Sequence, residues 1–250
     1  MTSDLLPSRG AGMASCMSAL KALLALAAVA LCVVVGWEIR YPTHAWNQKL
    51  TVTVSTPRGE VSGSSVVAVS WTESFFSGGW GGALFRLTLR GDATAVDLGG
   101  GQFLFAMLAY EHSQEPRSTG VIALKLLGDE AIYQSSDSFK RIQAARGRGP
   151  ITLPQKLYPK FLRFRDIKDP TTAEVVDPDN LAKSFGPGVR LVRVTIEITD
   201  DAVTRGIENI LPWLPQTQLA YFPHMRFGPK NFIDLDTLSS SWSKSSDTRK

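Results

Sequence analysis

Cysteine is nearly absent from this sequence of 250 residues, which contains only Cys16 and Cys32. Both precede residue 33, so the rest of the chain has no thiol that could form a disulfide, act as a nucleophile or bind zinc. Histidine is also scarce, and His44, His112 and His224 stand far apart, without a metal-ligand partner at short spacing. We expect surface or structural roles for all three.

The common signatures of catalytic and nucleotide-binding sites are missing as well. The sequence has no G-x-S-x-G turn, no Walker A loop, no G-x-G-x-x-G and no H-E-x-x-H. These absences argue against the hydrolases, nucleotide-binding proteins and zinc proteases that carry those motifs. We therefore expect no cofactor and no metal, and we favour a protein that is not an enzyme.

A long apolar run is present from Ala19 to Trp37, with Lys21 as its single charge. As a helix rising about 1.5 Å per residue, the run would extend roughly 28 Å, close to the hydrocarbon thickness of a bilayer. Lys21 lies near one end, where its side chain can reach the headgroups, and Trp37 and Tyr41 mark the other interface. The run predicts an uncleaved transmembrane helix over 19–37. A cleaved signal peptide and a buried core helix are the alternatives.

The charges that flank this run do not fix its orientation, because lysine and arginine are nearly balanced on its two sides. A short N-terminal anchor followed by a large folded part usually exports that part. The lack of cysteine after residue 32 is consistent with export. We expect a single-pass protein of the bacterial inner membrane with a periplasmic C-terminal domain.

Composition divides the chain into four parts. Residues 1–18 are small and polar, and residues 237–250 form a Ser-rich basic tail; we expect both to be disordered, because neither can bury much apolar area. Residues 19–37 would be the anchor, and residues 45–236 a soluble domain with one sizeable core. The net charge of +4 is a mild bias that selects no partner.

Alternation of apolar and polar residues predicts strands in most of the soluble domain. Residues 49–56 and 61–71 fit an antiparallel hairpin around the turn at Pro57–Glu60. A further strand is expected at 192–199, with Val192, Val194, Ile196 and Ile198 facing the core. Shorter strands are expected at 85–89 and 161–164, and the apolar run 103–108 fits a buried strand or a short helix.

Helices are expected to be few and short. One spans 137–147, with Ser136 or Asp137 as its cap and Gly147 at its end. A second spans 177–186, capped by Asp177 and ended by Gly186. Residues 121–127 fit either a helix or a strand.

A change of phase at Gly91–Asp92 predicts a bulge in the chain there. Together the elements predict a mainly β domain, either one antiparallel sheet or a sandwich, with a few short helices.

The strongest charge feature is a basic stretch from residue 140 to residue 168. It contains the candidate binding residues Lys140, Arg141, Arg146, Arg148, Lys156, Lys160, Arg163 and Arg165, with Lys168 at its end. Tyr158, Phe161 and Phe164 are interleaved with them. The pattern fits nucleic acid through phosphate contacts and stacking, or anionic lipid headgroups near a membrane. The alternative is a solvated surface whose aromatic side chains point into the core.

Carboxylates gather just after this stretch, between residues 166 and 179. They are Asp166, Asp169, Glu174, Asp177 and Asp179. Acidic oxygens at short spacing could bind calcium or serve as a catalytic acid and base. Ordinary turn and cap chemistry is the simpler interpretation, because proline follows two of the aspartates directly.

The run Phe161–Pro170, with Val176–Gly188 and Val194–Asp200, resembles a family of uncharacterised bacterial single-pass membrane proteins. The similarity extends to Gly206–Leu214 and includes Ser62–Val66 after the early turn, so it covers about two thirds of the chain. The Ser-rich tail lies outside it. The resemblance implies an N-terminal anchor and brings with it no activity, cofactor or catalytic residue.

Three hypotheses of function follow. The first is a membrane-anchored, exported β-rich domain that binds another component of the cell envelope, with an unidentified protein as its partner. The second is a membrane-tethered envelope hydrolase or ligand-binding protein that uses the 166–179 carboxylates. The third is a cytosol-facing module that binds nucleic acid or anionic lipid through residues 140–168, with nucleic acid the less favoured partner.

Overall fold

A computed structural model of the chain describes residues 20–33, 36, 43–74, 84–110, 117–128 and 136–214. The chain divides into two compact units. One comprises Met1–Thr43 with Thr72–Leu84, and the other His44–Trp71 with Phe85–Lys250. The expected disordered segments 1–18 and 237–250 lie outside the described residues.

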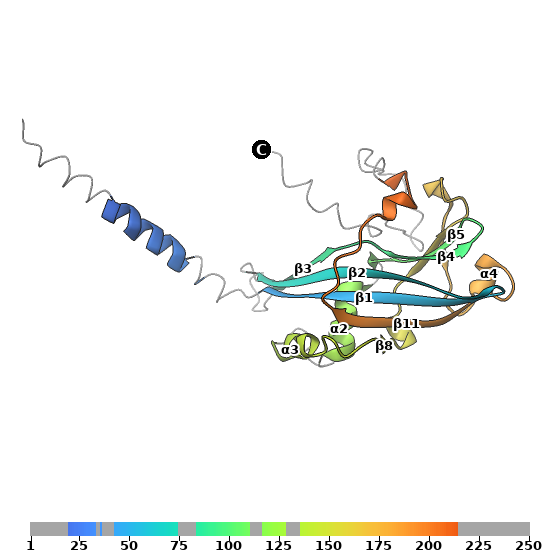
Figure 1. The fold of residues 1–250 in the computed structure, drawn as a ribbon, viewed down its shortest axis with the longest axis horizontal. Coiled ribbons are helices and arrows are strands. Elements are labelled where there is room, and N and C mark those ends of the chain that lie inside the picture. Colours follow the sequence, from blue (N-terminus) through green and yellow to red (C-terminus); the bar gives the residue numbers. More distant parts are fainter. Residues whose placement is uncertain are drawn as a thin grey trace, which may run out of the picture. The chain divides into compact units, whose positions relative to one another are not determined.

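In the first unit, residues 20–33 form a helix (Figure 1). Its large apolar side chains are all open to solvent, with exposed fractions of 59–73 %: Leu20, Leu23, Leu24, Leu26, Val29, Leu31 and Val33. Nowhere in the described ranges does a helix reach the length and apolarity needed to cross a membrane. Part of the expected 19–37 span lies outside those ranges, so the transmembrane helix stays a prediction.

The second unit contains most of two antiparallel sheets, so the expected mainly β fold with few helices is confirmed. The larger sheet has the strand order β3-β2-β1-β11-β8. Its strands are β1 (Thr43–Thr56), β2 (Gly59–Ser74), β3 (Leu84–Arg90), β8 (Ile151–Thr152) and β11 (Arg190–Thr199). The order of the smaller sheet is β10-β9-β5-β4. Its strands are β4 (Thr94–Gly99), β5 (Gln102–Ala106), β9 (Phe161–Phe164) and β10 (Ala173–Val176).

Short elements complete the described chain. A two-stranded sheet pairs β6 (Ala109–Tyr110) with β7 (Arg117–Ser118). The helices are α2 (Thr119–Leu127), α3 (Ser136–Ala144) and α4 (Leu181–Phe185). Three single 3-10 turns are η1 (Gln155–Leu157), η2 (Pro170–Thr172) and η3 (Ile207–Asn209). The ambiguous run 121–127 is therefore helical, and 103–108 is mainly strand.

The β1–β2 hairpin confirms the expected pairing of 49–56 with 61–71. Its inward side chains alternate as the sequence predicts, with Leu50, Val52 and Val54 buried on β1. On β1 the alternate positions are polar or charged: Asn47, Lys49, Thr51, Thr53 and Ser55. This alternation places one face of the large sheet against the core.

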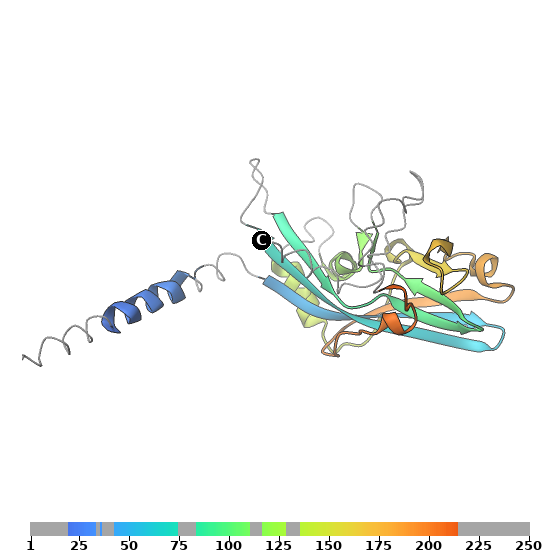
Figure 2. The same cartoon turned by 90° about the horizontal axis from the view of Figure 1, so that it is seen from above.

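Two different layers cover the inner face of the large sheet. The small sheet covers one half, where a Cβ on Gly63 of β2 would lie 2.0 Å from the carbonyl oxygen of Ala95 in β4. Helices α2 and α3 cover the other half (Figures 1 and 2). There Gln48 Nε2 donates to the Thr119 carbonyl at 2.6 Å, and Trp71 Nε1 donates to the Gly120 carbonyl at 3.3 Å.

The expected bulge at Gly91–Asp92 is wrong. The phase changes because the chain leaves the large sheet after β3 and enters the small sheet at β4. Asp92 lies at this crossing and is only 3 % exposed. Its carbonyl accepts a hydrogen bond from Ser65 Oγ, and its carboxylate accepts one from the Ile207 N–H at 3.1 Å.

Residues 200–206 form a strap across the outer face of the large sheet, from β11 toward η3 (Figure 1). The Asn47 side-chain amide donates to the Asp201 carbonyl at 3.0 Å, and Lys49 forms an ion pair with the Asp201 carboxylate at 3.2 Å. Farther on, the Thr204 N–H donates to the Val66 carbonyl at 2.9 Å. The strap therefore ties β1 and β2 to the C-terminal part of the described chain.

Beyond η3, the chain packs against the small sheet. The Trp213 ring meets the edge of Phe164 at a centroid distance of 5.2 Å, and Trp213 Nε1 donates to the Ile167 carbonyl at 2.8 Å. Leu211 and Leu214 are buried beside it. Phe164 of β9 therefore packs against both Phe105 of the small sheet and Trp213.

Two details of the expected strand and helix are wrong. Val192 does not face the core, because the register of β1 and β11 shifts after Thr53 and places Leu191 opposite Val54. Val192 is accordingly 37 % exposed.

The second helix begins at Leu181, capped by the Asn180 side chain, which accepts from the Lys183 N–H. Asp177 instead closes a turn before the helix, so only the end at Gly186 is confirmed.

Gly63→Ala tests the close approach of the two sheets. The added methyl group would overlap the Ala95 carbonyl, which is backbone and cannot turn away. We expect a loss of about 1–3 kcal/mol or more in the free energy of unfolding. Urea unfolding of the full chain in mild detergent, followed by tryptophan fluorescence, measures it.

Ser64→Ala is the matched control, because Ser64 is exposed on the same strand. It should change the free energy of unfolding by less than about 0.5 kcal/mol. Equal stability of the two variants would contradict the packing of β2 on β4.

Candidate functional site

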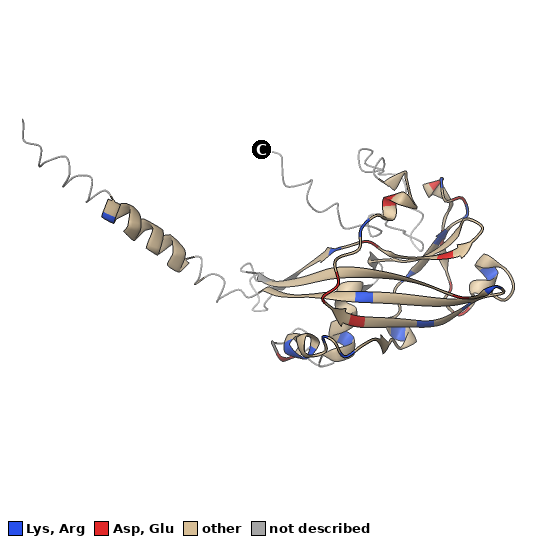
Figure 3. Cartoon of the chain, in the orientation of Figure 1, with Lys and Arg blue, Asp and Glu red and all other residues tan. Residues whose placement is uncertain are grey.

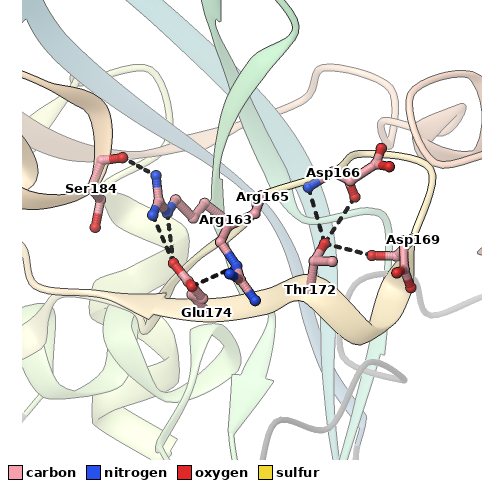
Figure 4. Close-up of polar contacts among 7 residues, drawn as sticks. All are labelled: Arg163, Arg165, Asp166, Asp169, Thr172, Glu174 and Ser184. Carbon is pink, nitrogen blue, oxygen red and sulfur yellow. Dashed lines mark hydrogen bonds and ion pairs between the residues drawn. The ribbon is translucent and has the colours of Figure 1, made fainter.

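The basic stretch and the carboxylates meet where β9 pairs with β10 (Figure 4). Arg163 on β9 lies directly opposite Glu174 on β10. Arg163 donates from Nε and Nη2 to one carboxylate oxygen of Glu174, at 3.0 and 2.7 Å. Arg165 Nε forms an ion pair with the other oxygen at 2.8 Å. Both oxygens of Glu174 are thus occupied by guanidinium groups.

Arg163 also connects the small sheet to α4. Its Nη1 donates to the Ser184 carbonyl, and its guanidinium carbon lies 5.5 Å from the centroid of the Phe185 ring. The side chain is only 19 % exposed. A guanidinium with this many partners holds elements together, and little of it is left for an external ligand.

The remaining carboxylates bond within their own turns or to a neighbouring side chain. Asp166 and Asp177 each accept from the backbone N–H two residues later, at 2.9 Å. Asp179 accepts from the Gln155 side-chain amide at 2.6 Å. These are the turn and cap roles that the sequence offered as the simpler interpretation.

Asp169 caps η2 in the same way. The hydroxyl and the N–H of Thr171 both donate to it, at 2.7 and 2.9 Å, and these bonds lower the pKa of the Asp169 carboxyl. A lowered pKa means that the stabilisation is present above the carboxyl's ordinary pKa and is lost as the pH falls through the lowered value. Across the ranges that the structure describes, no cluster of three or more His, Cys, Asp or Glu could hold a metal ion.

The basic stretch is spread over several elements (Figure 3). Lys140 pairs with Asp137 at 3.1 Å, and Arg146 pairs with Asp200 at 3.0 Å. Lys140 and Arg146 are exposed, as are Arg141, Arg148, Lys156 and Arg165. Lys160 is half-buried, and burial lowers its pKa. The eight candidate residues therefore do not form one continuous site.

The aromatic residues of this stretch belong to the core. Phe161 and Phe164 are buried, and Tyr158 meets the edge of Phe161 at a centroid distance of 6.3 Å. Phe164 packs against Phe105 at 5.7 Å. Stacking on nucleic-acid bases needs exposed rings, so this part of the nucleic-acid pattern is explained by packing.

Sequence reasoning missed a group of buried polar residues on the large sheet. Gln48 accepts from Trp46 Nε1 at 3.0 Å while it donates to α2, and Ser65 bonds to Asp92. The sequence indicates them only indirectly, because each is a polar residue at a position where the alternating pattern predicts an inward-facing side chain. Their hydrogen bonds are internal, so they stabilise the fold and offer no binding site.

The chain matches no family model, no curated protein and no solved structure. The resemblance to bacterial single-pass membrane proteins therefore stays a prediction.

Glu174→Gln tests whether the charged cluster is structural. The change removes the charge that both arginines share, and Arg163 is too enclosed to be fully hydrated. We expect a loss of about 1–2 kcal/mol in the free energy of unfolding, measured by urea unfolding of the full chain.

Glu60→Gln is the control, because Glu60 and Arg193 form an exposed pair at 3.8 Å. Its effect should stay below about 0.5 kcal/mol. A Glu174→Gln variant as stable as this control would show that the cluster does not support the fold.

Proposed function

We propose that the protein is a single-pass membrane protein, anchored by residues 19–37, whose exported β-rich domain binds another component of the cell envelope. The observation that carries the anchor is the exposure of every large apolar side chain on helix 20–33. Such a helix gains free energy when hydrocarbon surrounds it. The full run of 19–37 has the length that a bilayer requires.

A binding role is favoured over catalysis by what the charged groups already do. The carboxylates of 166–179 bond to arginines, to a glutamine and to backbone N–H groups. A general acid or base needs a carboxyl that is free to exchange a proton with a substrate. The tethered hydrolase is therefore the weaker proposal. Location in the inner membrane, with the domain in the periplasm, is part of the same proposal.

Leu26→Arg tests the anchor. A charge near the middle of a membrane helix costs about 2.5–3.5 kcal/mol, so the variant should shift from the membrane pellet toward the soluble fraction. Extraction of cell membranes with alkaline carbonate measures the distribution. Leu26→Met, which keeps the site apolar, should stay in the pellet. Complete extraction of the unaltered chain would refute the anchor.

Photo-crosslinking in native membranes tests the binding role. Val175 on β10 and Val192 on β11 are large apolar side chains exposed on the domain, so a photoreactive residue at either position reports on neighbours. We expect one stoichiometric envelope protein to be captured in vivo from one of these positions. If both positions yield only the uncrosslinked chain, and probes at Ser64 and Lys183 do the same, the binding role is wrong.

A further inference from the structure

The chain enters the domain beside α3. The His44 ring stacks on the Phe139 ring with centroids 4.0 Å apart and planes at 11°. Trp46 lies 6.3 Å from the same ring. Phe139 is buried, so this contact fixes the base of α3 against the first residues of β1.

Basic side chains gather at this end of the large sheet. Lys140 and Arg141 lie on the exposed side of α3, and Arg146 and Arg148 follow in the turn after it. The Gly147 N–H donates to the Ile198 carbonyl at 3.4 Å, and Ile198 pairs with Gln48 of β1. We call these four residues the basic end (Figure 3).

Among the residues that the structure describes, only part of this charge is neutralised. Asp137 pairs with Lys140 and Asp200 pairs with Arg146, so four cations face two carboxylates. Arg141 and Arg148 are exposed, and neither forms an ion pair with a residue that the structure describes. Counted over the described residues, a surplus of two positive charges is therefore open to an anionic partner.

The covalent connection limits how far this end can be from the anchor. Six residues, 37–42, join the helical residue Gly36 to Thr43. An extended chain advances at most about 3.5 Å per residue, so the connection reaches roughly 25 Å. If residues 19–37 span a bilayer, this length is the upper limit on the distance from the end of the anchor to Thr43 at the start of β1.

We propose that the basic end docks on anionic phospholipid headgroups of the membrane that holds the anchor, and so orients the domain. The inference rests on the proposed anchor. Each basic residue near an anionic surface strengthens attachment about fivefold, and the tether already supplies a high effective concentration. Two open arginines are therefore enough for docking on the same membrane. Nucleic acid is less suitable, because the rings of the basic stretch are in the core.

The test uses the full chain in nanodiscs, with Cys16 and Cys32 replaced by serine. A fluorophore is attached at Gln143→Cys, an exposed position on α3, and nitroxide-labelled headgroups quench it at short range. Discs of pure phosphatidylcholine are compared with discs that contain phosphatidylglycerol. We expect stronger quenching in the anionic discs and its loss at high salt. A fluorophore at Ser64→Cys, away from the basic end, should show no such difference.

Charge reversal identifies the residues. The double variant Arg141→Glu/Arg148→Glu should lower the docking equilibrium tenfold or more and abolish the lipid dependence. Lys183→Glu/Arg190→Glu makes the same change of net charge at two exposed residues outside the basic end and should behave like the unaltered chain. Equal quenching in both kinds of disc, or an unaffected Arg141/Arg148 variant, would overturn docking. A DNA oligonucleotide that binds through these arginines without any lipid dependence would overturn it in favour of nucleic acid.

Failure of the anchor gives a different result. In that case the chain would not enter the discs at all. Co-sedimentation with phosphatidylglycerol vesicles, using the same two double variants, then tests independently whether the basic end binds anionic lipid. If neither double variant changes the fraction of protein that sediments with the vesicles, lipid binding by the basic end is refuted.

Discussion

The described domain depends on how Asp92 is held. At this residue the chain leaves the large sheet and starts the small one, and the buried carboxylate and carbonyl both have partners from distant parts of the chain. Ser65 fixes the crossing to β2, and Ile207 fixes the C-terminal part to it. A buried carboxylate is costly unless it is hydrogen-bonded, so the Ile207 N–H offsets part of the cost of burying Asp92. Ile207 lies in the chain between the strap and the buried residues Leu211, Trp213 and Leu214.

Most charged residues of the described domain likewise bond to other parts of the protein. Glu174 serves two arginines, and one of these also bonds to α4. The aspartates close turns. Charge that looks functional in the sequence is largely used to join short elements that have little apolar surface of their own. Arg141 and Arg148 of the basic end are among the exposed charges that have no ion pair with a described residue, and they lie near the point where the chain enters the domain.

Much of the fold could be predicted from the sequence, because alternation and turn residues are local signals. The β1–β2 hairpin and the end of α4 at Gly186 were predicted in this way and are confirmed. Pairing between distant strands has no such signal, so the change of sheet at Asp92 was predicted as a bulge, and the register shift that exposes Val192 was missed. The basic stretch was recognised, but its division between α3, β9 and the turns depends on tertiary contacts. Composition alone could not separate Arg141 from Arg163.

The central claim is that residues 19–37 are an uncleaved tether and that the domain is exported. The most direct measurement is labelling of Gln143→Cys, in the Cys16→Ser/Cys32→Ser background, with a membrane-impermeant thiol reagent on intact spheroplasts. The account predicts labelling before lysis, on a species with the mass of the full sequence, 27.3 kDa. Labelling only after lysis, or on a shorter species that has lost the apolar run, would contradict it.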